Sequence, residues 1–227
     1  MIIQTGMRTD IPAFYSEWLV NRIKEGYVLV RNPYNQSQVT KYSLSPDFVD
    51  LIAFCTKNPA PMLAHMDVLK PYGQYWFVTI TPYGRDVEPH VPAKEIVMED
   101  FKKLSNLVGM DSVGWRYDPI FIDANHSVAW HIATFEKMAK NLSGYTKTCV
   151  ISFLDIYKKV ERNFPAARAV SKNDRLAIGK AFVEIAATYG MTIRPCAEGD
   201  ELAEFGADCS GCMTVNTFET ALHAHLD

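Results

Sequence analysis

Three cysteines toward the carboxyl end of the chain have the types and spacing that most clearly permit chemistry: Cys196, Cys209 and Cys212. Cys209 and Cys212 form a Cys-x-x-Cys pair, in which a tight turn lets two sulfurs bind one metal ion. Three thiolates with His223 or His225 as a fourth ligand would hold a structural zinc ion, whereas three thiolates alone would suit an iron–sulfur cluster with one open iron. A redox-active dithiol and simple structural thiols are the alternatives that the spacing leaves open.

Charged and amide side chains form a second candidate site, because they follow the β-rich runs of the sequence. They are Arg8, Asp10, Lys57, Asn58, Arg85, Glu88, Arg116, Asp118 and Lys158. Ligands of parallel α/β proteins bind beyond the carboxyl ends of the strands, so the cations predict a mouth that holds an anionic small molecule. The alternative is a ring of salt bridges that ties the loops together.

Roles within this mouth follow from residue type. Substrate binding is assigned to the cations and to the two polar residues beside them, namely Arg8, Asp10, Lys57, Asn58, Arg85 and Arg116. Asp118 and Glu88 are the candidate catalytic residues, since a positioned carboxyl group can accept and return a proton. Asp10 has a structural alternative, because an aspartate directly before a helix caps its first N–H groups.

Alternating strands and helices must position these residues. Strands are predicted over 2–5, 51–56, 75–80, 113–117, 148–153 and 191–194. Helices are predicted over 12–26 and 173–189, and two further helices from apolar stripes at helical spacing. The stripes are Val97, Phe101, Leu104 and Val108, and then Val128, Ile132, Phe135, Ala139 and Leu142. A β-hairpin over 27–31 and 38–43 follows the first helix.

Six such units predict a partial (β/α)6, TIM-like barrel with an inserted β-hairpin, because a complete barrel takes about 250 residues. A doubly wound open sheet also fits the alternation. Trp76 and Trp115 lie on the bulkier face of their strands, and Thr79, Arg116 and Asp118 on the more polar face, which favours a curled sheet around a ligand cavity. We expect one domain over 1–227, with the barrel in 1–195 and a short cysteine-containing tail in 196–227.

Composition excludes several classes of protein. The 227 residues are 48% hydrophobic, and 23 basic against 26 acidic side chains give a net charge of −3. This composition argues against disorder and against a surface for nucleic acid. No apolar run is long enough to cross a bilayer and no secretory signal is visible, so we expect a cytoplasmic protein without a membrane partner. Cys55 and Cys149, which lie singly in apolar runs, are expected to be small buried hydrophobes.

Common catalytic motifs are absent from the sequence. It contains no GxGxxG, Walker, HExxH or GxSxG pattern. The six histidines have no zinc-protease spacing. His126 and His131 flank a predicted helix start, and we expect them to lie at the surface or to cap that helix.

Several longer motifs resemble a known family. They are TDIPAFY at 9–15, VRNP at 30–33, TKNP at 56–59, WRYDP at 115–119 and CVISF at 149–153. In this order they resemble the bacterial and archaeal family Domain of Unknown Function 1848, from the N-terminus to about Cys196. The resemblance implies a barrel and a terminal cysteine cluster likened to the iron–sulfur motif of radical S-adenosylmethionine enzymes, with no assigned reaction. The cysteine-rich ending is short here, because no cysteine follows Cys212.

The sequence therefore predicts a metal- or iron–sulfur-dependent enzyme that acts on an anionic small molecule at the mouth of a barrel. Cys196, Cys209 and Cys212 would hold the metal; an open iron would bind S-adenosylmethionine, and a zinc ion would bind water. A protein with no cofactor is the remaining option. The alternative function is a non-catalytic protein that binds a small anion and has a structural zinc site or a metal-free tail.

Overall fold

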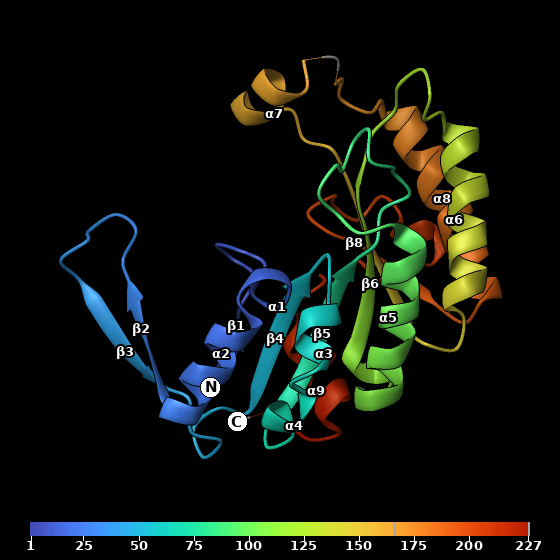
Figure 1. Ribbon diagram of the computed structural model, residues 1–227. Helices are drawn as coiled ribbons and strands as arrows, with labels where there is room; N and C mark the ends of the chain where they lie inside the picture. Colours follow the sequence, from blue (N-terminus) through green and yellow to red (C-terminus); the bar gives the residue numbers. More distant parts are fainter. Residues whose placement is uncertain (166, 227) are drawn as a thin grey trace.

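A six-stranded parallel sheet forms the centre of the computed structural model, which describes residues 1–165 and 167–226 (Figure 1). The strands are β1 (Ile2–Gln4), β4 (Leu51–Thr56), β5 (Gly73–Thr79), β6 (Val113–Ile120), β7 (Thr148–Phe153) and β8 (Thr192–Pro195). Their spatial order follows the chain, and each neighbouring pair is parallel. The α/β class and the six predicted strands are confirmed. With helices on its flanks, the sheet is compatible with a partial barrel.

A separate two-stranded sheet follows the first helices. It consists of β2 (Tyr27–Arg31) and β3 (Val39–Ser43), which pair antiparallel. Figure 1 shows this hairpin beside α2 and apart from the strands of the main sheet. Its side chains are exposed or half-buried along both strands, in contrast to β4, where five of the six residues are buried.

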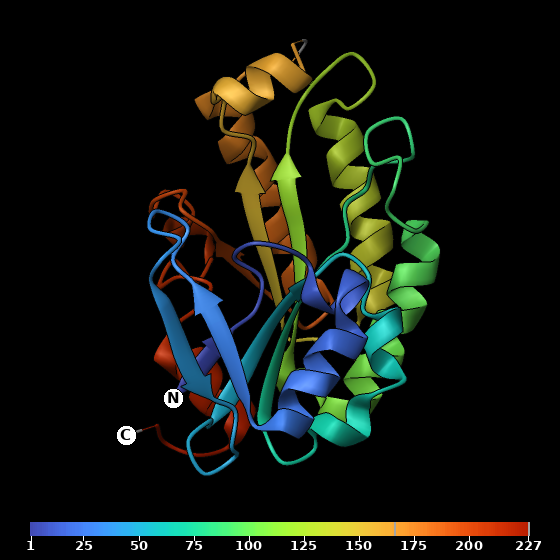
Figure 2. The ribbon, with the colours of Figure 1, turned by 60° about the vertical axis from the view of Figure 1, so that its left-hand side comes forward.

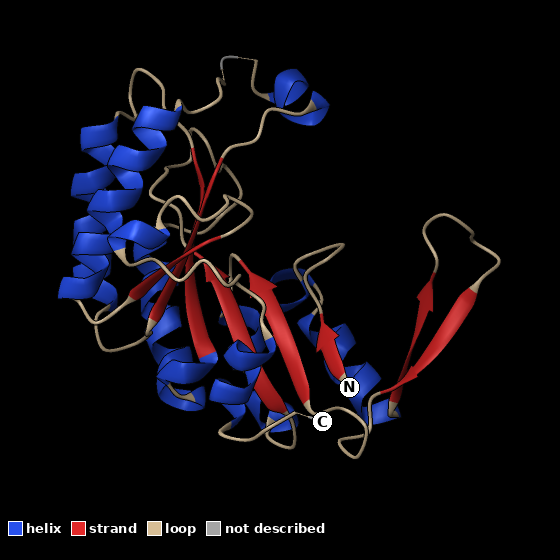
Figure 3. Ribbon diagram, turned by 180° about the vertical axis from the view of Figure 1, so that it is seen from behind, coloured by secondary structure: helices blue, strands red, loops and turns tan. Residues whose placement is uncertain are grey.

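The helices lie mainly on one side of the main sheet. They are α1 (Ile11–Phe14), α2 (Ser16–Glu25), α3 (Ala60–Leu63), α4 (Met66–Leu69), α5 (Lys94–Val108), α6 (Val128–Leu142), α7 (Lys158–Asn163), α8 (Lys172–Thr188) and α9 (Val215–Leu222). Two 3-10 turns, η1 (Met110–Ser112) and η2 (Ala203–Phe205), complete the elements. Figure 2 shows α9, in red, on the opposite side of the sheet from α5 and α6, and Figure 3 shows the same layers from behind. None of the helices in the described ranges is long and apolar enough to cross a membrane.

Alternation along the strands divides the core into two layers. Under the helices, Trp115 stacks on Phe135 at 5.0 Å between ring centroids, and Phe135 stacks on Phe182 at 3.8 Å. The predicted core thiol Cys149 is fully buried in this layer. On the other face, which we call the inner face, Phe218 of α9 covers a smaller apolar cluster. The face that carries Arg116 and Asp118 is therefore the one without the main helix layer.

Two local expectations are wrong. The helix predicted over 12–26 is two helices, because the backbone of Tyr15 leaves the helical region (φ −135°) between α1 and α2. His126 and His131 are buried rather than at the surface. His131 is inside because both ring nitrogens find partners there: Nδ1 lies 2.9 Å from the Tyr117 hydroxyl and Nε2 lies 2.8 Å from the Phe121 carbonyl oxygen.

Candidate functional site

Arg116 and Asp118 meet on the inner face of β6, near the carboxyl end of the sheet. Their ion pair joins Arg116 Nη2 to Asp118 Oδ2, and Asp118 Oδ1 accepts a hydrogen bond from the Ser152 hydroxyl of β7. Both members of the pair are largely buried, so these charge-assisted contacts fix their orientation. The Nε of Arg116 is buried and has no hydrogen-bond partner within 1–165 and 167–226. This N–H is therefore an unused hydrogen-bond donor in the interior.

The Arg116 guanidinium acts electrostatically on two of the three predicted cysteines. The sulfurs of Cys196, which follows β8, and Cys212 are 3.4 Å apart. A hydrogen bond from Cys196, assisted by the Arg116 guanidinium, lowers the pKa of Cys212 to about 6. The same hydrogen bond and burial raise the pKa of Cys196 well above its usual range. At neutral pH, Cys212 is therefore a thiolate and Cys196 the thiol that donates to it.

Cys55 is a functional candidate that sequence reasoning missed. It is half-buried and packs against the same apolar cluster as Cys196 and Cys212, so we call these three side chains the thiol cluster. Gln4 Nε2 donates to Cys55 Sγ at 3.5 Å, and burial raises the pKa of Cys55. The signal was present in the strand alternation, because Cys55 shares a face of β4 with Ala53 of the inner cluster.

Cys209 does not join the thiol cluster. Burial raises the pKa of the Cys209 thiol, and the carboxylates of Asp200 and Asp208 raise it further. Asp208 is itself held by Arg194, whose Nη2 lies 3.0 Å from the carboxylate. Throughout the described ranges, no three His, Cys, Asp or Glu side chains form a group that could hold a metal ion. This arrangement does not fit the predicted three-thiolate zinc or iron–sulfur centre.

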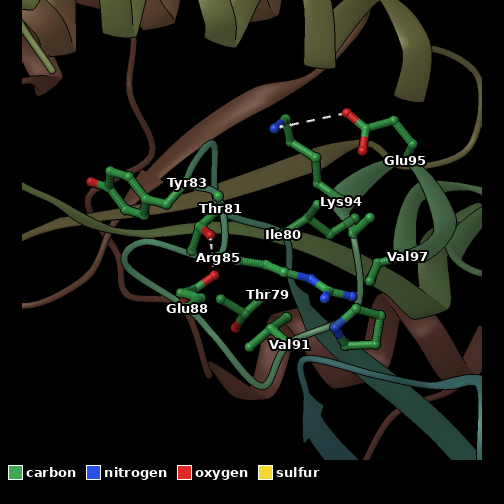
Figure 4. Close-up of a pocket in the computed structure, with 13 residues that line it drawn as sticks. Thr79, Ile80, Thr81, Tyr83, Arg85, Glu88, Val91, Lys94, Glu95 and Val97 are labelled. Carbon is green, nitrogen blue, oxygen red and sulfur yellow. Dashed lines mark hydrogen bonds and ion pairs between the residues drawn. The ribbon is translucent and has the colours of Figure 1, made fainter. Parts of the chain in front are cut away.

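Arg85 and Glu88 line a pocket of about 170 Å³ in the connection between β5 and α5. Glu88 accepts a hydrogen bond from the Thr81 hydroxyl and forms an ion pair with Lys57. Figure 4 shows the Arg85 side chain stretched across the pocket. Arg85 forms no ion pair with any residue that the structure describes. The pocket therefore offers a guanidinium that is not neutralised by a carboxylate, which suits an anionic ligand.

The pocket and the thiol cluster belong to neighbouring strands. Thr79 lines the pocket and is the register partner of Arg116 across β5 and β6. Arg116 itself acts electrostatically on Cys55 and Cys212 of the thiol cluster. Arg116 and Asp118 thus lie with two of the predicted cysteines, whereas Arg85 and Glu88 line a pocket that begins at the neighbouring strand β5.

The other predicted substrate-binding residues have structural partners or lie elsewhere. Asp10 Oδ1 accepts from a backbone N–H of α1 at 3.0 Å, and Oδ2 accepts from the Lys57 N–H at 2.7 Å, so the helix-capping alternative is confirmed. Asn58 Oδ1 accepts from the first N–H of α3 at 3.3 Å. Arg8 is exposed and lines a different cavity. The salt-bridge alternative is correct for Lys57, whose ammonium group faces Glu88.

Comparison with known proteins shows the family to which this chain belongs. Among solved structures it is similar to a protein of Bacteroides thetaiotaomicron VPI-5482 described as a "putative alpha-L-fucosidase", with 14% sequence identity, coverage of 97% of this chain and 82% of that chain, and a TM-score of 0.34. No curated protein matches the chain. The family described as "Domain of unknown function (DUF1848)" matches residues 2–226, which is nearly the whole length. The chain therefore belongs to the DUF1848 family.

Proposed function

We propose that the protein is an enzyme that acts on a small anionic disulfide at the carboxyl end of its sheet, with Cys196 and Cys212 as the reactive dithiol. The observation that carries this proposal is the 3.4 Å separation of the two sulfurs next to the Arg116 guanidinium. A thiolate with a lowered pKa is the attacking species in thiol–disulfide exchange, and a second thiol within reach completes the reaction.

The electrons and protons balance within this dithiol. The Cys212 thiolate attacks one sulfur of the substrate disulfide and expels the other half as a thiolate, which takes the proton of Cys196. Cys196 then attacks the Cys212 sulfur of the mixed disulfide and expels the second half, which takes a proton from solvent. The substrate gains two electrons and two protons and becomes two thiols, while the protein becomes a Cys196–Cys212 disulfide. A small cellular thiol regenerates the dithiol by the reverse exchange.

Anion recognition is assigned to two arginines. The Arg116 guanidinium acts on the sulfur of Cys212, and Arg85 crosses the pocket in the connection between β5 and α5. Asp118 keeps the Arg116 guanidinium in place and shares it with the ligand. Glu88 holds Lys57 in the same way. Asp10 and Asn58 shape the loops and take no direct part.

The proposal treats the main sheet as a (β/α)6 partial barrel with an inserted hairpin, in which the inner face is the ligand-facing surface. A dithiol that must stay reduced between turnovers suits a reducing compartment, and we place the protein in the cytoplasm for that reason.

A second candidate is a non-catalytic protein that binds a small anion and has a metal-free tail. One observation favours it: packing and charge fasten the described tail to the inner face. Phe218 meets the Tyr75 ring edge-on at 5.8 Å between centroids, and Asp208 is paired with Arg194. In this function the arginines bind the anion, and the thiols neither react nor take part in binding.

The test is to purify the full chain anaerobically, measure its metal content, and add oxidised glutathione as the anionic disulfide. We expect two equivalents of reduced glutathione per chain and a Cys196–Cys212 disulfide by peptide mass spectrometry. The Cys212→Ser variant should release none, whereas the matched Cys209→Ser control should react like the wild type. A neutral disulfide, hydroxyethyl disulfide, should react more slowly, and Arg116→Gln should reduce that difference.

Two results would overturn the enzyme proposal. Iron or zinc that co-purifies with the chain and is lost in Cys196→Ala would make the dithiol a metal site. Saturable glutathione disulfide binding without release of reduced glutathione would instead support the non-catalytic binding protein.

A further inference from the structure

A second, larger cavity lies at the other edge of the main sheet. It encloses about 600 Å³, the size range of small-molecule sites, among β1, α2, the β1–α1 loop and β2. Trp18, Leu29, Arg8, Arg22 and Arg31 are among the fifteen residues that line it. No acidic residue is among them. The cavity is thus apolar in its body and basic in its charged groups.

The lining includes large apolar side chains that are exposed to solvent. Met7 is 83% exposed, Leu29 57% and Trp18 42%. Large exposed apolar side chains gathered around one hollow are typical of a binding site, whereas scattered ones need no explanation. An occupant with an apolar body would remove this surface from water.

The three arginines give the site its charge. Within the part of the chain that the structure describes, Arg8, Arg22 and Arg31 form no ion pair, although the chain has more acidic than basic side chains. Arg22 approaches the Tyr27 ring at 6.0 Å, and Arg8 and Arg31 are exposed. Three guanidinium groups around one apolar cavity, without a carboxylate in its lining, are complementary to an anionic head group.

We propose that this cavity binds a single-chain fatty carboxylate, with the hydrocarbon chain in the apolar body and the carboxylate on the arginines. The site lies between β1 and the hairpin. Although Gln4 of its lining donates to Cys55, the site contains none of the three sulfurs and does not require the proposed disulfide exchange. It also gives the β1–α1 loop and the hairpin a shared ligand, because both contribute arginine and apolar side chains to one cavity.

The test is calorimetric titration of the full chain with dodecanoate, decanoate and octanoate below their micelle-forming concentrations. We expect saturable binding of one molecule per chain that tightens about fourfold for each added methylene. Trp18 lines the cavity, so binding should also change the tryptophan fluorescence, and Trp18→Phe should remove that change. Dodecanol, which has the chain without the charge, should bind at least tenfold more weakly than dodecanoate.

Variants separate the head-group site from a general apolar surface. Arg8→Gln, Arg22→Gln and Arg31→Gln together should weaken dodecanoate binding about tenfold or more and leave dodecanol binding unchanged. The matched control Arg162→Gln, on the exposed α7 far along the chain, should change neither. Equal affinity for dodecanol and dodecanoate would overturn the proposal. So would light scattering that shows a stable dimer of this chain whose formation blocks dodecanoate, since a second copy would then be the occupant.

Discussion

At the scale of single residues, the chemistry of the thiol cluster depends on which sulfur loses its proton. Cys196 and Cys212 are equivalent as amino acids, but their surroundings separate their pKa values in opposite directions. The hydrogen bond between the two sulfurs is the largest cause of both shifts, because it stabilises one thiolate and requires one thiol. The Arg116 guanidinium stabilises the thiolate further. The asymmetry is what assigns the attacking role to Cys212.

Alkylation of Cys212 should follow this low pKa. Because a thiolate reacts with iodoacetamide and a thiol does not, the rate at Cys212 should be half-maximal near pH 6 and level above it, rather than still rising toward pH 9. In Cys196→Ala the donor is lost, so the midpoint should move upward. Peptide mass spectrometry at each pH measures the rate, and Cys209→Ser should leave the midpoint unchanged. A wild-type midpoint near pH 9 would remove Cys212 as nucleophile.

His131 should make folding stability depend on pH. Burial lowers the pKa of His131 below its ordinary value of 6.5, so the unfolded chain binds the proton more readily than the folded one. The contribution of His131 to the free energy of unfolding is therefore fully present above pH 6.5. Below that pH it decreases, by up to about 1.4 kcal/mol per pH unit. Denaturant titrations at pH 7 and pH 5 measure the loss. It should shrink in His131→Gln, which retains one donor and one acceptor, and persist in the exposed control His90→Gln.

At the scale of elements, α9 holds the carboxyl-terminal segment against the inner face. Phe218 is 7% exposed and packs on Tyr75 of β5. Gly73, at the start of β5, permits this approach, since a Cβ there would lie 2.1 Å from Leu222 Cδ2. The segment that carries Cys212 leads directly into α9, so the packing of this helix also determines where the thiolate lies.

Phe218→Ala should loosen this segment and the thiol cluster together. Removal of the buried ring should cost about 3 kcal/mol in the free energy of unfolding. Limited proteolysis should then cut within 203–222, and the alkylation midpoint of Cys212 should rise because its partners move away. Val215→Ala, at a 58% exposed position of the same helix, is the matched control and should change neither measurement. An unchanged midpoint in Phe218→Ala would show that α9 does not position Cys212.

The main elements could be predicted from sequence because their signals are local. Strands such as β4 and β7 are buried on both faces and therefore read as continuous apolar runs. Helices α5 and α6 show the apolar stripe that their burial requires. The short helices α3, α4 and α7 span four to six residues, too few for a periodic pattern. The helix α9 spans only eight residues and was not predicted.

The site could be predicted only in part, because its assembly is non-local. Arg116 and Asp118 were found from the rule that ligands meet strand ends. The Cys-x-x-Cys spacing suggested that Cys209 and Cys212 act together, but Asp208 is bound to Arg194 and Cys209 stays beside it. The partner of Cys212 is instead Cys196, sixteen residues earlier. No spacing rule gives the path of the loop between them.

At the scale of the whole molecule, the chain joins a well-buried sheet to a lightly attached hairpin. The central strands lie between the main helix layer and the inner-face cluster, whereas β2 and β3 pair only with each other within the described residues. An isolated two-stranded hairpin is marginally stable in water. Regions with few buried contacts open locally with little free energy, while the core opens only with the whole molecule. The cavity with three arginines lies at the junction of these two parts.

Hydrogen exchange should therefore divide the molecule into two classes of strand. Backbone amides in 27–31 and 39–43 should exchange at least roughly a hundredfold faster than those of β4, β5 and β6, because the hairpin opens without unfolding the sheet. Dodecanoate should slow exchange in the hairpin and in the β1–α1 loop, since both line its proposed site, and leave β6 unchanged. Mass spectrometry of peptides at neutral pH, with and without the ligand, measures both effects. The prediction fails if the hairpin amides of the ligand-free chain exchange as slowly as those of β4 at every protein concentration. The two sheets would then unfold as one unit, and ligand binding would have no separate opening of the hairpin to suppress.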